Sequence, residues 1–277
     1  MINLQKKIAC VSDISGVGKC SLTVALPIIS ALKCQCCPLT TSVLSSQTGY
    51  PKYTFRDLTD SMDDYIDVWS ELDIKFDTIY SGFLGSRKQI KIVEKFINMN
   101  KEAFVIVDPV LADLGKLFPI FNDEDVLEMK KLVSMANLIT PNITEANLLC
   151  GRNADYFDYN DEELLKVCRS LSAIGPEYII VTGYESQGNI YNICYNSKSD
   201  SIKKIGKEYN RISFSGTGDT FTSIVAGMIT RDFSIEESVQ YATDFIYDAV
   251  NFTVDQPHFN RNDGILFEYF LHRLTCL

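Results

Sequence analysis

The sequence is short of histidine, has no long apolar run and carries no excess of basic residues. Its 277 residues include two histidines, and no segment approaches the length needed to cross a membrane. The opening segment MINLQKKIAC lacks an apolar stretch long enough for a signal peptide, so we expect a cytoplasmic protein that does not act in a membrane. The formal net charge of −10 argues against nucleic acid as a partner, because binding a phosphate backbone needs a basic surface.

Cysteine is plentiful, but its arrangement does not suggest disulfides or a metal site. The nine cysteines are odd in number and irregularly spaced, as expected for free thiols in a reducing compartment. Cys34 and Cys37 form a single C-x-x-C with no second pair, and the only histidines are His258 and His272. We interpret them as small apolar side chains in a strand rather than as a metal or redox centre.

Apolar strand-like runs alternate with helical patterns along the chain. The runs that are apolar on both faces, as buried parallel strands are, comprise residues 7–12, 39–44, 77–82, 103–108, 136–140 and 177–182. The patterns between them that predict helices cover residues 20–32, 60–72, 87–98, 123–135, 144–150 and 161–174. Residues 189–206 alternate in polarity and predict antiparallel strands at one edge, followed by helices at 218–231 and 234–254. We expect residues 1–277 to form one α/β domain, with a doubly wound, mainly parallel sheet flanked by helices on both faces.

Residues 12–23, SDISGVGKCSLT, resemble a phosphate-binding P-loop only superficially. A P-loop needs a glycine separated from Gly-Lys by four residues, and a hydroxyl after the lysine, but Asp13 and Cys20 occupy those positions. The aspartate would repel phosphate. The glycines therefore indicate either a tight turn from a strand into a helix or a place where another ligand approaches the backbone.

Polar residues follow several predicted strands at the end where each strand passes into a loop. They are Ser12, the pair Gln47 and Thr48, and residues 81–85 (SGFLG), 108–113 (DPVLAD), 140–145 (TPNITE) and 182–183 (TG). Each has a structural explanation by itself, since proline stops a strand and Asn142 or Thr144 suits a helix cap completed by Glu145. Ligands of open parallel sheets bind beyond the carboxyl ends of strands, so their number on one rim predicts a binding site.

The stretch SGTGDTF, residues 215–221, is the strongest local signal of chemistry. Two glycines before an apolar helix bring free backbone N–H groups and the positive end of the helix dipole together, which suits phosphate or an oxyanion. Asp219, in the first turn, is either a stabilising acid or a proton acceptor. An anion hole beside a carboxylate is what phosphoryl transfer to an alcohol requires.

These motifs together resemble a known family. GTGD opening a helix, TPNITE and DPVLAD, supported by SQTGY (residues 46–50) and SGFLGS (residues 81–86), are similar to the ribokinase-like superfamily and most of all to the vitamin B6 kinases. The match spans nearly the whole chain. The resemblance implies a ribokinase-like fold and ATP-dependent phosphorylation of the 5′-hydroxymethyl group of pyridoxal, pyridoxamine or pyridoxine.

The resemblance implies a role for each matching residue. Asp219 would be the catalytic base, and the anion hole would consist of the amides of Gly216, Thr217 and Gly218. The carboxylates that would place Mg²⁺ near the ATP phosphates are Asp108, Asp113 and Glu145. The other residues expected on the ATP side are Asn142, Thr140 and Thr182.

The resemblance also places the acceptor. The residues expected to hold the pyridine ring are Ser12, Thr48 and Phe83. The glycines of residues 16–18 would then allow close approach of a flat ring, and Lys19 would be a solvated residue outside the phosphate path. Family resemblance further implies a homodimer. It leaves undecided whether a monovalent cation is an additional cofactor.

Two alternatives remain. The N-terminal loop resembles that of the hydroxymethylpyrimidine kinases of the same superfamily, although Asp219 stands where those enzymes commonly carry cysteine. A non-catalytic protein that binds pyridoxal phosphate in the same cleft is the other alternative. Such a binder would not need a base, magnesium carboxylates and an anion hole together.

Overall fold

The computed structural model describes residues 5–277, and in that range the main sheet has nine strands. Their order across the sheet is β11 (Ser201–Glu208), β10 (Asn189–Asn196), β9 (Tyr178–Ser186), β8 (Leu138–Ile139), β5 (Phe104–Val107), β4 (Thr78–Ser81), β1 (Lys7–Ser15), β2 (Gln35–Leu44) and β3 (Phe55–Asp57). Neighbours from β9 to β2 are parallel, whereas β10, β11 and β3 add antiparallel strands at the two edges. The expected mainly parallel sheet is confirmed.

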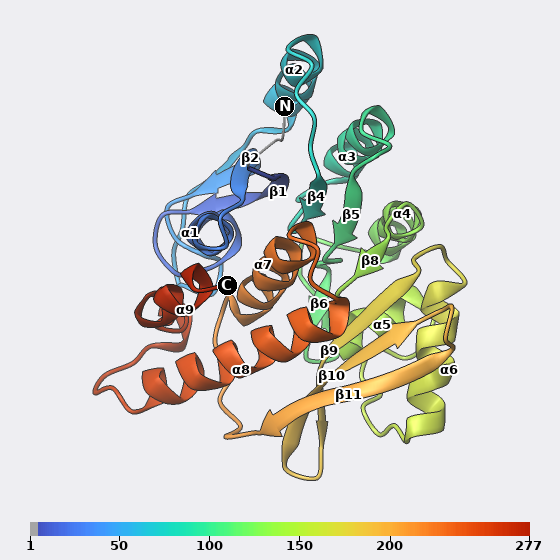
Figure 1. Cartoon of the computed structure of the whole chain (residues 1–277), viewed down its shortest axis with the longest axis vertical. Helices are drawn as coiled ribbons and strands as arrows, with labels where there is room; N and C mark the ends of the chain where they lie inside the picture. Colours follow the sequence, from blue (N-terminus) through green and yellow to red (C-terminus); the bar gives the residue numbers. More distant parts are fainter. Residues whose placement is uncertain (1–4) are drawn as a thin grey trace.

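Helices cover both faces of the sheet (Figure 1). One face carries α1 (Ser21–Ala31), α7 (Thr217–Thr230), α8 (Ile235–Val254) and α9 (Leu271–Thr275). The other carries α2 (Thr59–Glu71), α3 (Arg87–Met99), α4 (Asp123–Val133), α5 (Ile143–Leu149) and α6 (Asp161–Ser172). This confirms the doubly wound architecture predicted from the alternating pattern.

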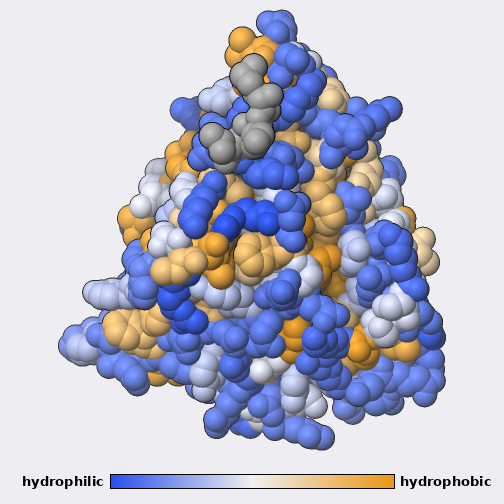
Figure 2. Space-filling view, viewed as in Figure 1, coloured by the Kyte–Doolittle hydropathy of each residue, from blue (hydrophilic) through white to orange (hydrophobic). Residues whose placement is uncertain are grey.

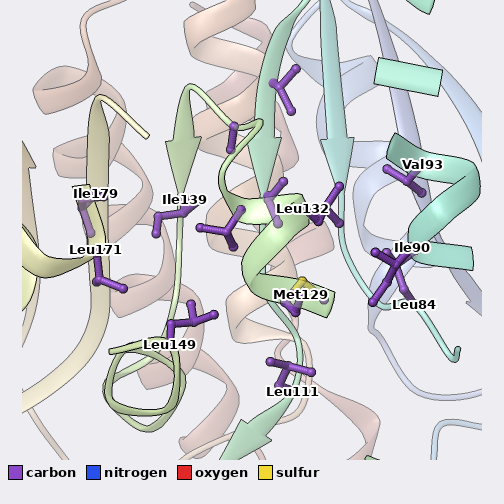
Figure 3. Close-up of a cluster of buried hydrophobic side chains, with 14 of the residues drawn as sticks. Leu84, Ile90, Val93, Leu111, Met129, Leu132, Ile139, Leu149, Leu171 and Ile179 are labelled. Carbon is purple, nitrogen blue, oxygen red and sulfur yellow. The ribbon is translucent and has the colours of Figure 1, made fainter. Parts of the chain in front are cut away.

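The strands supply both hydrophobic layers because successive side chains point to opposite faces. In β1, Ala9 and Val11 join one layer, while Ile8 and Cys10 join the other. Figure 3 shows the first layer, where side chains from the sheet meet helices α3 to α6. Strands buried on both faces explain why these segments read as continuous apolar runs rather than as alternating ones.

The helices begin in two different ways. Capping boxes start α4, α5, α6 and α8 at Asn122, Asn142, Asn160 and Ser234. In each, the N-cap side chain accepts the amide of the third helical residue, whose side chain accepts the N-cap amide. In contrast, α7 begins at Gly216 without a side-chain cap. Its first amides therefore remain free to meet a ligand.

Several small secondary-structure elements were not predicted from the sequence. Strand β1 continues to Ser15, beyond the expected end at Ser12, through a register irregularity between Ser12 and Ile14. A second sheet pairs β6 (Ala112–Asp113) with β7 (Lys116–Leu117), and the 3₁₀ helices η1 (Arg261–Asp263) and η2 (Phe267–Phe270) precede α9. These short segments have no apolar periodicity long enough to predict them.

The cysteines are free thiols, as expected. Cys34 is buried just before β2, and Cys37 is half-buried within it. Cys36, also in β2, lies with its Sγ 3.3 Å from the Sγ of Cys10 in β1. The interpretation of the C-x-x-C as part of the strand packing is therefore confirmed.

The face of the molecule that carries α7 and α8 is mainly polar. Figure 2 shows hydrophilic residues over most of the face that carries α7 and α8, with hydrophobic residues in separate groups between them. Among the helices of residues 5–277, none combines the length and the apolar character that a membrane span requires.

Candidate active site

The carboxyl ends of β4, β5 and β8 lie level with one another and with Val11 of β1, which continues past them to Ser15. The register pairs Ser81 of β4 with Val11 of β1 and with Val107 of β5, and it pairs Val107 with Ile139 of β8. The residues that follow at this edge are therefore side by side: Ser12, Gly82, Asp108 and Thr140. The polar rim that the sequence predicts is a single row in the structure.

The amino end of α7 faces this row, and Gly216 makes its approach possible. Gly216 is the N-cap and has φ of 77°, in the left-handed region. A Cβ there would lie 1.8 Å from the carbonyl oxygen of Lys19, so no other residue fits without moving the backbone. Thr217 is half-buried and Gly218 exposed, which leaves this helix end open to solvent.

Asp219 is a half-buried carboxylate in the first turn of α7. Burial raises the pKa of Asp219 to about 6; the negative charge of Asp13 adds to the rise, and a hydrogen bond from the Ser21 backbone opposes it. Ser21 also meets Asp13 through its side chain. It has φ of 50°, a strained conformation that costs about 1–3 kcal/mol, so the first residue of α1 is held where it contacts both carboxylates.

Asp108 is connected to α7 through Thr222. The Thr222 hydroxyl lies 3.3 Å from Oδ2 of Asp108 and 3.1 Å from Oγ1 of Thr140, and all three residues are buried. Thr222 follows Asp219 by three positions, so both side chains lie on the same face of the helix. Burial, and after it the charge of Asp219, raise the pKa of Asp108 to about 8.

Glu145 is buried and serves as an anchor. Its Oε1 accepts the amides of Leu111 at 3.0 Å and Ala112 at 3.4 Å, and its Oε2 accepts the amide of Asn142 at 2.9 Å. The side chain of Asn142 in turn accepts the Glu145 amide at 2.9 Å and donates to the Ala112 carbonyl at 2.8 Å. Burial and the charge of Asp108 raise the pKa of Glu145, although its backbone hydrogen bonds oppose this. The cap that the sequence offered as an alternative is thus present, and it fixes the loop after Asp108.

The three carboxylates expected at magnesium are not gathered into a preformed site. Within residues 5–277, no three His, Cys, Asp or Glu side chains are grouped so that they could hold a metal ion. Asp113 is exposed in β6 and accepts the Leu114 amide at 2.8 Å, whereas Asp108 and Glu145 are buried and interact electrostatically. Because Mg²⁺ is usually held by one or two carboxylates together with substrate phosphates, the assignment stays a prediction.

Thr182 lies beside the cap that Asn142 and Glu145 form. Its amide donates to the Pro141 carbonyl at 2.9 Å, and it forms an isolated parallel bridge with Asn142. The structure therefore brings Thr140, Asn142 and Thr182 together along one edge, as the sequence led us to expect.

Ser12 and Phe83 meet at the other end of the row. The Ser12 hydroxyl is buried and accepts the Phe83 amide at 3.2 Å. Gly82 allows this contact, since a Cβ there would lie 3.0 Å from the Ser12 Oγ. The half-buried Phe83 ring lies 6.2 Å from the ring of Phe121 between centroids.

Thr48, which was expected to hold the ring, is exposed, and its neighbour Gln47 is the buried residue of the pair. Both lie in the loop after β2. The Gln47 Nε2 donates to Ser215 Oγ at 3.3 Å and to the Asn262 carbonyl at 3.2 Å, and its Oε1 accepts the Gly49 amide at 2.7 Å. Gln47, rather than Thr48, therefore connects this loop to the start of α7.

Comparison with known families identifies the family of the chain. The model of the phosphomethylpyrimidine kinase family matches residues 25–266. The chain belongs to this family. Its sequence relatives include a pyridoxal kinase of Arabidopsis thaliana, 27% identical over 202 residues, and a hydroxymethylpyrimidine/phosphomethylpyrimidine kinase of Aquifex aeolicus, 25% identical over 171 residues. These matches cover 69% and 61% of this chain and 63% and 65% of the relatives, so the chain spans just under two thirds of their lengths.

Solved structures of the phosphomethylpyrimidine kinase family and of pyridoxal kinases share the fold. A protein of Bacteroides thetaiotaomicron assigned as a phosphomethylpyrimidine kinase is 40% identical, with a TM-score of 0.95 over 99% of this chain and 95% of that one. A second crystal form of it, containing pyridoxal, has a TM-score of 0.93 at 40% identity and covers 98% of this chain and 96% of that one. Pyridoxal kinase of Lactobacillus plantarum is 26% identical, with a TM-score of 0.91 over 98% and 97% of the two chains. The resemblance to the vitamin B6 kinases is confirmed.

Lys19 is paired with other residues, whereas we had expected it to be solvated. Its Nζ donates to the Ile265 carbonyl at 3.0 Å and lies 3.1 Å from Oε2 of Glu268. The ammonium also lies 5.9 Å from the ring centroid of Phe267. Lys19 is thus bound to the C-terminal segment, which further weakens the P-loop interpretation.

The sequence analysis did not assign three residues to the site that the structure brings into it. Asp13 served there only to reject a P-loop, yet it is a buried carboxylate that accepts the Ser15 hydroxyl at 3.1 Å. Its signal was a charged residue inside an apolar strand. Thr222 could have been found from its spacing to Asp219, whereas nothing in the local sequence distinguishes Gln47 from Thr48.

Proposed function

We propose that this protein transfers the γ-phosphoryl group of ATP to the 5′-hydroxymethyl group of pyridoxal, pyridoxamine or pyridoxine. The observation that carries the proposal is the position of Asp219, a half-buried carboxylate beside the free amides that open α7. Its pKa, raised to about 6, suits a general base that works near neutral pH. The pyridoxal-containing structure of a 40% identical relative supports the acceptor.

The reaction needs a proton acceptor and stabilisation of phosphoryl charge. In the proposed mechanism, Asp219 takes the proton of the acceptor hydroxyl as its oxygen attacks the γ-phosphorus. The bond from that phosphorus to the β–γ bridging oxygen breaks, and ADP leaves. The amides of Gly216, Thr217 and Gly218 face the charge on the transferred group, and Asp219 afterwards releases the proton to solvent.

The residues present fit magnesium as the partner of ATP. Asp108 is a buried carboxylate at the centre of the row, and burial together with Asp219 raises its pKa to about 8. A nearby divalent cation would favour its charged form. Mg²⁺ bound there with the ATP phosphates would neutralise phosphate charge, with Asp113 and Glu145 as the further carboxylates of the predicted set. Thr140, Asn142 and Thr182 would line the nucleotide phosphates.

A pyrimidine alcohol is the second candidate acceptor. The family model and the Aquifex aeolicus relative favour it, because that relative matches about as well as the pyridoxal kinases do. Ser12 and Phe83 would then meet a pyrimidine ring instead of a pyridine ring. Competition between pyridoxal and hydroxymethylpyrimidine, each at equal concentration, would rank the two acceptors.

The experiment for the proposal measures ADP release with ATP, Mg²⁺ and each candidate alcohol. Asp219→Asn should keep the fold and lose about 10²–10⁴ in turnover, since general base catalysis contributes that much. Asp123→Asn removes a first-turn acid of α4 and is the matched control. Its turnover should stay within twofold of the unaltered protein.

Two results would contradict the proposal. Asp219→Asn with a turnover within a factor of three of the unaltered protein would remove Asp219 from the base role. Binding of pyridoxal phosphate with no ADP release from any alcohol would instead favour the non-catalytic binder.

A further inference from the structure

A turn near the C-terminus touches three loops of the candidate site. It consists of residues 260–264 and contains η1, and the Asn260 side chain caps it by accepting the Asn262 amide at 3.0 Å. We call residues 260–264 the clasp. None of them was singled out by the sequence analysis, and the mechanism above does not use them.

The clasp holds the loop of residues 45–50, which carries Thr48. Asn262 Nδ2 donates to the Gly49 carbonyl at 2.9 Å, and the Asn262 carbonyl accepts Gln47 Nε2 at 3.2 Å. Tyr50 donates its hydroxyl to a carboxylate oxygen of Asp263. This loop is therefore fixed from two sides by one turn.

The clasp also holds the loop that leads into α7. The carbonyl of Arg261 accepts the Ser215 amide at 3.2 Å, and Arg261 Nε donates to the Ser213 carbonyl at 2.7 Å. Gln47 closes the connection, because its Nε2 reaches Ser215 Oγ at 3.3 Å as well as the clasp. The buried Gln47 amide thus joins the loop of residues 45–50, the clasp and the start of α7.

The third loop, residues 16–20, is packed against the clasp without spare room. The Lys19 amide donates to the Asp263 carbonyl at 3.3 Å. Gly264 has φ of 79°, and a Cβ there would lie 2.8 Å from the Cβ of Lys19. On its other side, the Lys19 carbonyl excludes a side chain at Gly216. A shift of the clasp would therefore displace Lys19 and, through its carbonyl, Gly216 at the N-cap of α7.

We propose that the clasp, through Asn262 and Gln47, fixes the two loops expected to hold the acceptor, residues 16–20 and 45–50, in position relative to the anion hole of α7. Asn262 is accordingly a positioning residue for phosphoryl transfer, which it influences through Gly49 and Thr48 without touching the reacting atoms. The inference rests on the proposed function only for its kinetic consequence. Its structural part concerns the coupling of two loops and is measurable by itself.

Hydrogen exchange of the ligand-free protein tests the coupling directly. Asn262→Ala removes the side-chain bond to Gly49 and should speed amide exchange about 2- to 10-fold both in residues 45–50 and in residues 213–219. Asn100→Ala is the matched control, because it removes an Nδ2 bond of 2.9 Å to the Phe96 carbonyl at the end of α3. It should leave both segments unchanged. Faster exchange confined to residues 260–264 in Asn262→Ala would overturn the proposal.

Steady-state kinetics tests the consequence for the reaction. Asn262→Ala should raise the KM for pyridoxal about 2- to 10-fold and leave the KM for ATP within twofold, since the weakened loop lies on the acceptor side. Combined with Thr48→Ala, its effect on the pyridoxal KM should be smaller than in the unaltered background, because both changes act through one loop. Additive effects, or equal rises in both KM values, would overturn the positioning role.

The two proposals fail in different ways. If the unaltered protein phosphorylates no alcohol, the proposed function fails, while the exchange experiment still decides whether the clasp couples the loops. If the unaltered protein is active but Asn262→Ala and Asn100→Ala behave alike in both experiments, the clasp proposal fails and the proposed function stands.

Discussion

The pKa of Asp219 makes a specific prediction about the acid side of the pH profile. A base must be deprotonated, so kcat/KM should fall as the pH drops through the pKa of Asp219, which burial raises to about 6. With that value the base is about 90% ionised at pH 7 and about 9% ionised at pH 5. An aspartate with the ordinary pKa of about 3.9 would still be about 93% ionised at pH 5. The expected loss between pH 7 and pH 5 is therefore about tenfold.

Asp13→Asn is the perturbation that tests the cause. The negative charge of Asp13 helps to raise the pKa of Asp219, and burial raises the pKa of Asp13 as well. Replacing Asp13 by asparagine removes this charge and keeps the size of the side chain. The acid limb should move to lower pH, and the variant should retain more of its pH 7 activity at pH 5 than the unaltered protein does.

The assay is kcat/KM for pyridoxal at saturating ATP and Mg²⁺ from pH 5 to pH 8. Titration of ATP itself is common to both proteins, so the comparison between them isolates Asp219. Of the other titratable groups near Asp219, Cys20 and Tyr80 do not titrate at the acid end, because burial raises the pKa of Cys20 to about 12 and raises that of Tyr80. Asp108, whose pKa burial and Asp219 raise to about 8, is present in both proteins, so its titration is common to them. Superimposable acid limbs in the two proteins, or a midpoint near pH 4 in the unaltered one, would refute the reasoning.

Three further predictions follow from individual contacts. Glu145→Gln should lower the free energy of unfolding by about 1–3 kcal/mol in a denaturant titration, because its amide group cannot accept all three backbone amides; an unchanged stability together with a raised magnesium requirement would instead favour a role at the metal. Lys19→Ala should leave the KM for ATP within twofold in steady-state kinetics, since Lys19 is paired with Glu268, whereas a P-loop lysine would be essential for ATP use. Gly216→Ala should lower the melting temperature far more than Gly218→Ala, because a Cβ at Gly216 meets the Lys19 carbonyl at 1.8 Å and one at Gly218 has nothing within 4 Å; equal melting temperatures would argue against the close approach.

Much of the fold was predictable because each strand and helix carries a local signal. The parallel strands are buried on both faces and read as apolar runs, and the antiparallel edge of β10 and β11 reads as alternation with a turn. The row of Ser12, Asp108 and Thr140 also followed from the sequence, since residues after parallel strands share one edge of the sheet.

The remaining features depend on contacts between distant segments. Which of Gln47 and Thr48 points inward is set by Asn262 and Ser215, which lie far away in the sequence. The orientation of Asp13 depends on the register irregularity after Ser12, where simple alternation no longer holds. Such arrangements follow from packing rather than from local pattern, and a single sequence does not reveal them.

The position of the clasp late in the sequence has a consequence for folding during synthesis. Strand β1 and the loop that follows it precede the clasp in the chain, so they leave the ribosome well before the turn that holds them against α7. A nascent chain can therefore assemble most of its sheet before the three loops are joined. On the proposed mechanism, phosphoryl-transfer competence would be acquired only after residues 260–264 have been synthesised and the three loops are joined.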